Sequence, residues 1–327
     1  MAEAFILAGA VVVAFWIDHQ WGEPPARCHF VVWMGGYLGW AGEGLAPAAD
    51  SVDMSARDIK SLGRGAAAWM AGATVVLGVA WAVQWVCLML ARQGWLATAL
   101  AALLLGLALK PLLAWRMLRS EVQAVEAALG ESLQAGRERT RWLVSRDVTH
   151  LTEAQVRESA IESLAENLND SVVAPVFWFV LLGLPGAALY RFANTADAMW
   201  GYHSVRNGRV WEWAGKWAAR ADDVLSWVPA RITAALLVLV AGGMPLAALR
   251  REAGRTPSPN SGWPMAAMAL ALDVCLNKPG VYALNASGRP AKAVDTARAV
   301  VYAWKATIVI VLIALLAILL IVKGAPQ

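Results

Sequence analysis

The chain alternates long apolar runs with shorter polar stretches, which is the pattern of a protein that crosses a membrane several times. Gly65–Ala91 and Trp95–Trp115 are each long enough to cross a bilayer as a helix, because a crossing takes about 20 apolar residues. Only Arg92–Gly94 separates them, so the two runs are predicted to form a helical hairpin. Ala4–Ile17 and Ala306–Val322 are expected to be the first and the last membrane helix.

Two further apolar stretches, Ser171–Leu189 and Ile232–Leu249, are short or are broken by glycine and proline. Ser171–Leu182 is only about a dozen residues long before Gly183 and Pro185, which favours a re-entrant or protein-buried helix over a simple crossing. If both stretches crossed, the polar segment between them would lie outside, but its basic residues favour the cytoplasmic side. We therefore predict an all-α, polytopic helical membrane protein with cytoplasmic helical segments and re-entrant helices.

Composition supports this class and excludes others. The 327 residues are 59% hydrophobic and only 16% charged, and the mean hydropathy is +0.50, which is outside the usual range of a water-soluble domain. The three cysteines are scattered, so neither a disulfide framework nor a cysteine metal site is predicted. Basic residues are spread over the polar segments without a compact stripe, so nucleic acid is not an expected partner.

The distribution of lysine and arginine predicts the domain organisation. Residues 1–327 are expected to form a single integral membrane domain. Segments 116–170 and 250–304 are basic and are predicted to be cytoplasmic, the first of them helical. Segment 145–231 places charged residues beside membrane-grade apolar sequence and is predicted to be the active-site core. No symmetry between two halves indicates a transporter built from inverted repeats.

A helix is predicted to begin near Glu153, because Thr152 and Gln155 have the spacing of a capping box. One face of this helix is apolar and the nearly opposite face is acidic, with Glu158, Glu162, Glu166 and Asp170 at intervals of four. The acidic face is either solvated or compensated by a metal ion or a cationic partner, because like charges four residues apart repel each other.

More polar residues follow at Tyr190, Arg191, Asn194 and Asp197, and again at Arg220, Asp222, Asp223 and Arg231. Charged groups so close to membrane sequence are costly, so a functional role is the default hypothesis. The alternative is that they are interfacial anchors or structural ion pairs.

Several blocks of the sequence resemble one known family. SRDVTHLTEAQ (145–155), ESLAENLNDSVVAP (162–175), GLPGAALYRFANTADAMWGY (183–202), AARADDVLSWVPAR (218–231) and SPNSGWP (258–264) are similar to signature blocks of the adenosylcobinamide-phosphate synthase family, of the CobD/CbiB type. The blocks are in family order, and the resemblance extends from about Asp18 to Tyr282. Several long adjacent blocks are a far more specific signal than one short motif.

The chain departs from the family pattern at several positions. Glu23 stands in place of an aspartate and Phe30 in place of a proline in the N-terminal block. Met265 stands where the SPNSGWP block usually continues with a glutamate, and Lys278–Tyr282 resembles a shifted form of the family's Gly-Pro-x-x-Tyr. The departures at Glu23 and Phe30 make the N-terminal block a weaker indicator of function than the central blocks. If the glutamate replaced by Met265 were catalytic, the activity of this chain would be in doubt, so we expect that glutamate to be dispensable.

The resemblance implies an ATP- and magnesium-dependent ligase in a bacterial inner membrane, with its active-site loops in the cytoplasm. It would join an aminoalcohol phosphate, either aminopropanol phosphate or ethanolamine phosphate, to the carboxylate of adenosylcobyric acid and give adenosylcobinamide phosphate. The expected partners are the corrinoid, which brings its own cobalt, the aminoalcohol phosphate, membrane lipid and, left open, further copies of the chain. No P-loop motif is present to bind ATP.

The resemblance and the residue chemistry together give the expected site. The expected catalytic residues are Glu166, Asp197, Arg220 and Asp223. The expected substrate- or phosphate-binding residues are Arg146, Asn167, Arg191, Asn194, Arg231 and Asn260. The expected magnesium ligands are Glu162, Glu166, Asp170 and Asp222, because carboxylate oxygens suit this ion.

Two points stay open at this stage. The aromatic residues Trp178, Trp200, Tyr202, Trp211 and Trp213 either cover a corrinoid cavity or mark the membrane interface. The alternative function is a non-catalytic membrane sensor of the AmpE type, which would need no ATP site. A sensor has less need for so many acids and arginines together.

Overall fold

The computed structural model describes residues 2–49, 57–144, 146–202 and 205–324, so Ser145, the predicted start of the active-site core, lies outside the described residues. The chain forms two compact units. The first consists of Met1–Leu113, Pro175–Leu225 and Ala314–Gln327, and the second of Ala114–Ala174 and Ser226–Ile313. Each unit is described by itself.

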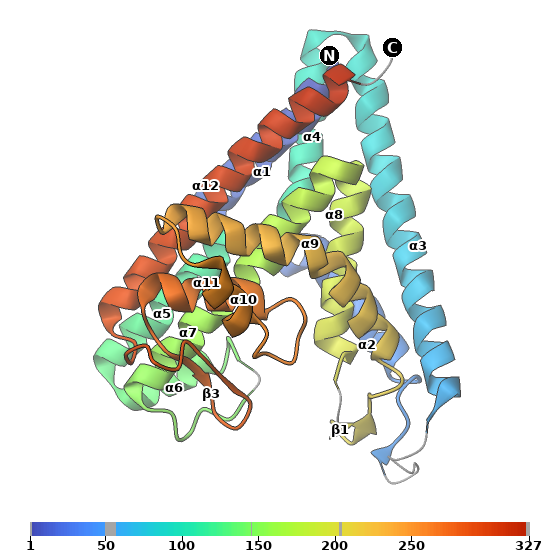
Figure 1. Ribbon diagram of the computed structural model, residues 1–327. Coiled ribbons are helices and arrows are strands. Elements are labelled where there is room, and N and C mark those ends of the chain that lie inside the picture. The colour runs from blue at the N-terminus through green and yellow to red at the C-terminus, as the bar shows by residue number, and fades with distance from the viewer. Residues whose placement is uncertain (1, 50–56, 145, 203–204, 325–327) are drawn as a thin grey trace. The chain divides into compact units, whose positions relative to one another are not determined.

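The described residues are almost entirely helical, as predicted (Figure 1). The helices are α1 (Ala2–Trp21), α2 (Phe30–Gly42), α3 (Ile59–Leu90), α4 (Trp95–Leu109), α5 (Trp115–Glu131), α6 (Leu133–Thr140), α7 (Glu153–Leu168), α8 (Ala174–Trp200), α9 (Lys216–Val240), α10 (Leu246–Ala253), α11 (Gly262–Leu272) and α12 (Ala293–Gly324). Short 3₁₀ turns are η1 (Ala26–Cys28), η3 (Ala91–Gln93) and η4 (Lys110–Leu112), and η5 (Asn169–Val173) is a π-helical segment. Two small hairpins pair β1 (Val205–Arg206) with β2 (Arg209–Val210), and β3 (Leu276–Lys278) with β4 (Tyr282–Leu284).

Within these described residues, six helical stretches are long and apolar enough to cross a membrane, which confirms the polytopic membrane class. They are Ala2–Trp21, Ile59–Gln93, Trp95–Glu131, Glu153–Trp200, Lys216–Val240 and Ala293–Ile321. The predicted turn between α3 and α4 is present as η3 followed by Gly94, whose φ of 132° suits glycine.

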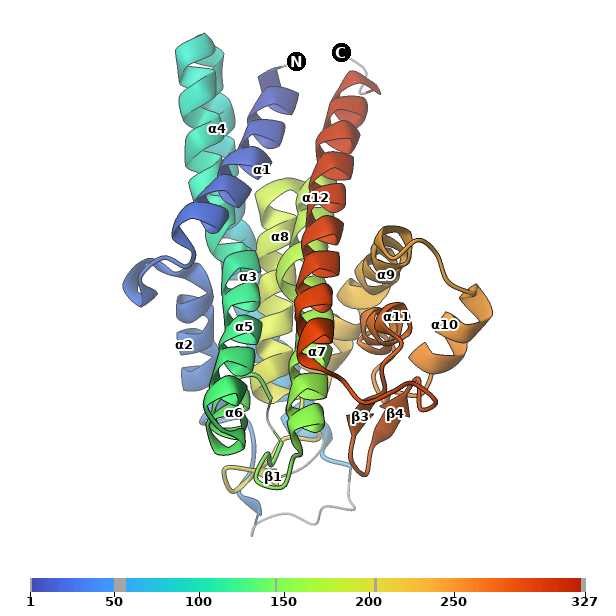
Figure 2. The same ribbon diagram turned by 90° about the vertical axis from the view of Figure 1, so that its left-hand side faces the viewer.

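In the first unit, α1 and α4 run side by side (Figure 1, Figure 2). Small residues allow the close approach: a Cβ atom on Gly106 would lie 2.6 Å from Cβ of Val13. Such contacts between small residues are how helices associate in a membrane, where apolar burial alone provides little attraction.

Helix α8 reverses its direction at Gly183, which has φ 67° and ψ −155°. A Cβ atom on Gly186 would lie 2.4 Å from the carbonyl oxygen of Trp178, whereas residues eight apart in one continuous helix lie about 12 Å apart along the axis. The break predicted at Gly183 and Pro185 is therefore a tight hairpin. Pro185 suits the first turn of the second arm, where its missing N–H has no partner to lose.

Two helices go beyond the sequence predictions. Phe30–Gly42 forms α2, where no helix was predicted. Lys216 begins α9, so Arg220 and its acidic neighbours lie on a helix. The stretch Ile232–Leu249 is broken by glycine, as predicted: it divides between α9 and α10, and Gly242 and Gly243 adopt positive φ values of 87° and 102°.

In the second unit, α7 begins as predicted, with a complete capping box between Thr152 and Gln155. Its apolar face is fully buried, but Glu158 and Glu162 are also buried, with 5% and 7% of their surface exposed. Helix α11 and strand β3 pack against α7. The solvated-face interpretation is therefore wrong for these two carboxylates.

Candidate functional site

The predicted residue Arg146 lies just before α7 and contacts the buried acidic face of that helix. Its Nη2 donates hydrogen bonds to Glu162 Oε2 at 3.2 Å and to Ser159 Oγ at 2.7 Å. Arg146 thus supplies the cationic partner that the acidic stripe was expected to need. Its Nε and Nη1 are buried without a hydrogen-bond partner among the described residues, so two donors on one guanidinium are still available to an acceptor.

Tyr282 on β4 completes this arrangement, and its hydroxyl donates to Glu162 Oε1. Burial, the negative charge of Glu162, the hydrogen bond to it and the charge of Glu166 raise the pKa of Tyr282 well above its ordinary value. Tyr282 therefore stays protonated and remains a donor. The sulfur of Met265, which is 1% exposed, lies 3.8 Å from the Tyr282 hydroxyl. We refer to Arg146, Ser159, Glu162, Met265 and Tyr282 as the Glu162 cluster.

The segment after Glu162 contains two asparagines with different roles. The predicted binding residue Asn167 donates to the carbonyl of Ser163 at 2.9 Å, so its amide group contacts its own helix. Asn169, which sequence reasoning missed, donates to Asp170 Oδ1 at 2.8 Å and accepts from the hydroxyl of Thr233 at 3.0 Å. Asn169 begins the π-helical segment, a distortion that is frequent at functional sites.

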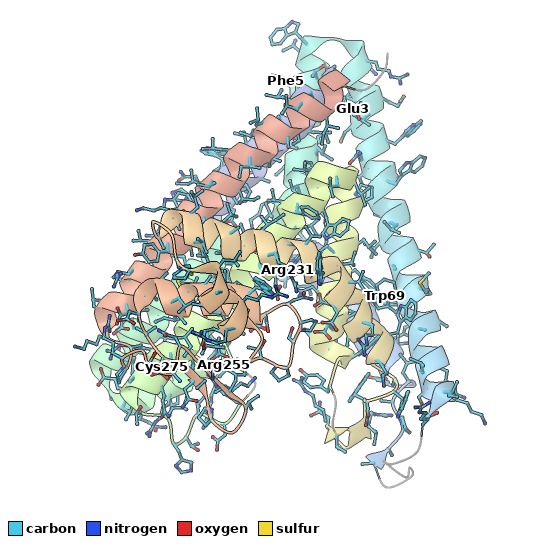
Figure 3. All side chains as sticks on the ribbon, viewed as in Figure 1. Glu3, Phe5, Trp69, Arg231, Arg255 and Cys275 are labelled. Atoms are coloured by element: carbon cyan, nitrogen blue, oxygen red, sulfur yellow. The ribbon has the colours of Figure 1, made fainter. Side chains whose placement is uncertain are left out.

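The structure also brings together the predicted residues Arg231 and Asn260. Arg231 Nη1 donates to Asn260 Oδ1 at 2.6 Å, and its Nη2 donates to the carbonyl of Pro259 at 2.9 Å. Arg231 is labelled in Figure 3. Its guanidinium carbon lies 4.5 Å from the ring centroid of Trp227 and 5.0 Å from that of Trp263. These contacts hold Arg231 in a fixed position against α9 and the SPNSGWP block.

In the first unit, three predicted residues form a chain of hydrogen bonds. Arg191 Nη1 donates to Asn194 Oδ1 at 3.3 Å, and Asn194 Nδ2 donates to Asp222 Oδ1 at 3.4 Å. We refer to these three residues as the Asp222 cluster. Asp197 Oδ1 lies only 1.9 Å from where a Cβ atom on Gly201 would be, so any larger residue at position 201 would displace this carboxylate.

Other predicted residues of the first unit lie on α9 or in the packed core. Arg220 lies exposed on α9, and Asp223 is half-buried on the same helix. Trp200 is 1% exposed and donates to the carbonyl of Leu38, and its ring stacks on that of Trp211 with centroids 6.3 Å apart. These two tryptophans are core residues of the first unit, which favours a packing role over contact with a corrinoid.

Sequence reasoning missed Lys110, which joins the acids of the N-terminal block. Its Nζ lies 3.0 Å from Asp18 Oδ1 and 3.0 Å from Glu23 Oε1, and only 3% of its side chain is exposed. His29 Nε2 lies 2.9 Å from Glu23 Oε2. Burial tends to raise the pKa of Glu23, but the hydrogen bond to His29 and the charge of Lys110 outweigh it and lower this pKa. Lys110 is the one charged residue in Trp95–Trp115, a signal that could have indicated a buried ion pair.

Comparison with known proteins identifies the family. Residues 11–311 match the family described as CobD/Cbib protein. The chain belongs to the CobD/CbiB family. A probable cobalamin biosynthesis protein CobD of Methanothermobacter thermautotrophicus is 39% identical over 293 residues, which are 87% of this chain and 88% of the relative. A protein of the same description from Pyrococcus abyssi is 39% identical over 277 residues, 85% of this chain and 84% of the relative.

A cobalamin biosynthesis protein CobD of Brucella melitensis is 42% identical over 211 residues, which are 59% of this chain and 63% of that protein. No solved structure matches the chain. The blocks that carry the CobD/CbiB resemblance therefore belong to a match that covers most of the chain, and the expected family is confirmed.

The expected magnesium ligands of this CobD/CbiB protein lie on α7, on its π-helical extension and on α9. In the part of the chain that the structure describes, no group of three or more His, Cys, Asp or Glu side chains is placed to hold a metal ion. Glu162, Glu166 and Asp170 belong to the second unit and Asp222 to the first. Magnesium is commonly held by one or two carboxylates together with substrate phosphate, so its binding at α7 stays a prediction.

Proposed function

We propose that this CobD/CbiB family member is adenosylcobinamide-phosphate synthase. In the proposed reaction, ATP activates the free carboxylate of adenosylcobyric acid, and the amino group of an aminoalcohol phosphate forms an amide with it, with release of ADP and phosphate. Family membership and the relatives described as cobalamin biosynthesis proteins support this proposal. The aminoalcohol is aminopropanol or ethanolamine, both as phosphate esters.

The observation that carries the proposal is the pair of buried, unpartnered nitrogens on Arg146. A guanidinium whose Nη2 is fixed by Glu162 and Ser159 presents its Nε and Nη1 to a further acceptor. Because Nε–H and Nη1–H point to different sides of the planar guanidinium, each would donate to a separate oxygen, and phosphate and carboxylate oxygens are good acceptors of such charge-assisted hydrogen bonds. All three proposed substrates carry such an anion, and Arg146 would bind and orient one of them.

Glu162 and Tyr282 have positioning roles in this proposal. The carboxylate of Glu162 is held between Arg146 and the Tyr282 hydroxyl, so its orientation is fixed. Glu166 and Asp170 follow on the same side of α7 and its π-helical extension, and are half-buried. One or two of these carboxylates, together with the phosphate oxygens of ATP, would make the mixed ligand set that magnesium commonly takes, and the ion would neutralise the phosphate charge.

We further propose that the protein lies in a bacterial inner membrane with the Glu162 cluster on the cytoplasmic side, where ATP is available. The arginine-rich sequence of 116–170 supports this orientation, because cytoplasmic segments are enriched in basic residues. In the first unit, the Asp222 cluster would bind the amide groups or the phosphate of a substrate through Arg191 and Asn194.

The test is a reconstitution with purified full-length protein in detergent. Adenosylcobyric acid, ATP and magnesium are incubated with aminopropanol phosphate or ethanolamine phosphate, and the corrinoid product and ADP are followed together. Equal amounts of product and ADP are expected, with none when ATP is omitted. If corrinoid binds without turnover in all combinations, the ligase proposal is wrong, and a membrane sensor becomes the better account.

A further inference from the structure

A groove in the second unit lies outside the Glu162 cluster. It is enclosed by α5 and the first turns of α12 and has a volume of about 680 Å³, which is within the range of small-molecule sites. The lining residues recur at helical spacing and extend over about 18 Å of α5 and about 16 Å of α12. They are Trp115, Arg119, Gln123, Glu126, Ala127, Ala293, Thr296, Ala297, Val300, Val301 and Trp304.

Two deeply buried donors line this groove. Trp115 is 1% exposed and Thr296 is 3% exposed, and neither the indole Nε1 nor the hydroxyl has a hydrogen-bond partner among the described residues. Thr307 on the same helix shows the ordinary solution, because its hydroxyl donates to the carbonyl of Ala303 at 2.9 Å. Buried polar groups are rarely left unpaired, and an indole N–H can only donate, so the missing partner is an acceptor.

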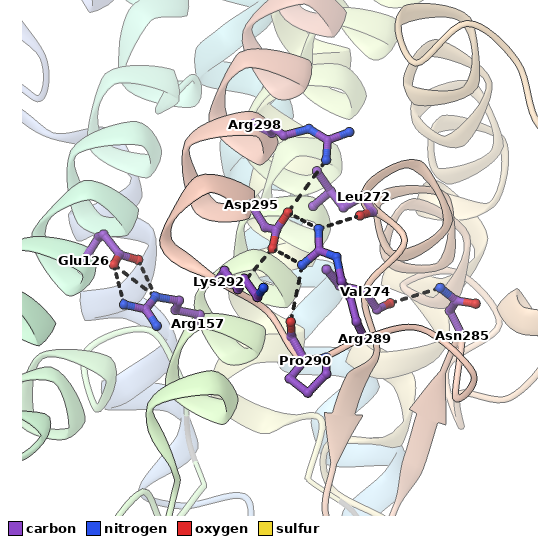
Figure 4. A network of polar contacts seen from close by, with 10 residues as sticks. All are labelled: Glu126, Arg157, Leu272, Val274, Asn285, Arg289, Pro290, Lys292, Asp295 and Arg298. Carbon is purple, nitrogen blue, oxygen red and sulfur yellow. Dashed lines mark hydrogen bonds and ion pairs between the residues drawn. The ribbon is translucent and has the colours of Figure 1, made fainter.

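The charges around the groove favour an anion. The acid that lines it, Glu126, is bound by Arg157 through two nitrogens at 3.0 and 2.8 Å (Figure 4). Asp295, next to Thr296, is bound in the same bidentate way by Arg289 at 2.6 and 2.7 Å. Arg119 follows Trp115 by four residues, so both lie on one face of α5, and its positive charge is not opposed by a free acid lining the groove.

One end of the groove adjoins membrane-grade sequence. Trp115 stacks on Trp304 with ring centroids 5.5 Å apart, and α12 then continues into its apolar run. Val301, Ile308 and Leu312 share one face of α12 and are 47%, 41% and 59% exposed. Tryptophans at the end of an apolar helix mark the membrane interface, so the groove joins a polar, cationic region to a lipid-facing surface.

We infer that this groove binds an anionic phospholipid. The phosphate and ester oxygens accept hydrogen bonds from Trp115 Nε1 and the Thr296 hydroxyl, and Arg119 balances the phosphate charge. The acyl chains lie against the exposed face of α12 that begins at Val301. Cationic pockets beside membrane helices are a common way of binding acidic headgroups. The apolar face argues against free phosphate, and the uncompensated Arg119 argues against a zwitterionic lipid.

The first experiment uses the full-length protein in mild detergent with equal amounts of phosphatidylglycerol and phosphatidylcholine. Native mass spectrometry is expected to show phosphatidylglycerol retained in about tenfold preference. The same lipid, and not inorganic phosphate, is expected to raise the thermal unfolding temperature, because a ligand that binds only the folded state stabilises it. Equal retention of the two lipids, or an equal shift with phosphate alone, would overturn the inference.

Variants locate the binding in the groove. Arg119→Gln removes the exposed positive charge. A double variant, Arg119→Gln with Thr296→Val, also removes the buried hydroxyl donor. Both are expected to lower the preference for phosphatidylglycerol, the double variant by about tenfold. Arg250→Gln removes another exposed charge, on α10, which does not line the groove, and is the matched control. If the control loses as much lipid as Arg119→Gln does, the binding is unspecific charge attraction. If the folded double variant retains as much lipid as wild type, the lipid binds elsewhere on the protein.

Discussion

The side-chain Oε1 of Gln84 on α3 accepts a hydrogen bond from the backbone N–H of Leu184 at 2.7 Å. Leu184 begins the second arm of the α8 hairpin, where N–H groups have no partner inside the helix. Gln84 thus caps a helix that restarts within apolar sequence. A Cβ atom on Gly183 would lie 2.2 Å from this amide, so the turn and its cap fit only with glycine at position 183.

Replacing Gln84 with methionine should destabilise the protein while leaving an apolar side chain of similar length on α3. The Leu184 N–H would lose its partner, which costs about 1 to 3 kcal/mol for a buried donor. The measurement is the unfolding of purified protein by denaturing detergent. Gln84→Glu keeps an acceptor and is expected to retain more stability than Gln84→Met; equal stability of wild type and Gln84→Met would show that the cap contributes nothing.

Arg146→Gln should lower kcat/KM of the proposed ligase by about 10- to 150-fold. The reason is the net loss of one charge-assisted hydrogen bond to substrate, which contributes about 1.5 to 3 kcal/mol. Arg146→Lys keeps the charge but not the several fixed N–H donors of the guanidinium, and should lie between wild type and Arg146→Gln. Arg139→Gln removes a half-buried arginine paired with Glu121 and serves as the control. Equal turnover in Arg146→Gln and in this control would remove Arg146 from the site.

Local sequence was sufficient for most helices. Membrane-length apolar runs predicted α1, α3, α4 and α12, because the length of such a run is a property of consecutive residues. The capping box predicted the start of α7, and glycine with proline predicted the break in α8. Helix α2 was missed because its 13 residues are too few for a crossing and follow a polar block.

The contacts within the site could not be predicted from the sequence, because they join residues that are far apart along the chain. The blocks indicated Arg146 and Glu162, but nothing local pairs Glu162 with Tyr282, which is 120 residues away. Lys110 could be recognised as a costly charge in an apolar run. Its partners Asp18 and Glu23 could not, because α2, α3 and α4 separate them from Lys110 along the chain. The π-helical segment at Asn169 has no pattern that distinguishes it from an ordinary helix.

Glu23 should make stability depend on acid pH. Its folded pKa is lower than its unfolded value, taken as 4.5, so its contribution is present above that pH and is lost as the pH falls through the folded pKa. Thermal unfolding is measured from about pH 7 down to about pH 3, the range in which carboxyl groups become protonated. The unfolding temperature of wild type should fall more steeply with acid than that of Glu23→Gln. Parallel curves for the two proteins would show that His29 and Lys110 do not stabilise the charged form.

Met265→Glu restores the residue that the family block usually has, and it tests whether this chain needs an acid there. The new carboxyl would lie beside Tyr282, whose single hydrogen is already donated to Glu162. Two buried carboxyls at close range cannot both ionise readily, so one would take up a proton near neutral pH. We therefore expect lower stability and an acid limb of the pH–rate profile displaced to higher pH, with no gain in kcat.

Met265→Leu is the matched control for this substitution, because it conserves volume and polarity and should cost less than about 1.5 kcal/mol. The pH–rate profiles and unfolding curves of the two variants and wild type are compared in the reconstituted assay. A rise in kcat for Met265→Glu with an unchanged pH profile would contradict the prediction. Such a result would mean that a glutamate at position 265 acts in the reaction. It would also mean that Glu162, which is held by Arg146 and Tyr282, does not take over that role in wild type.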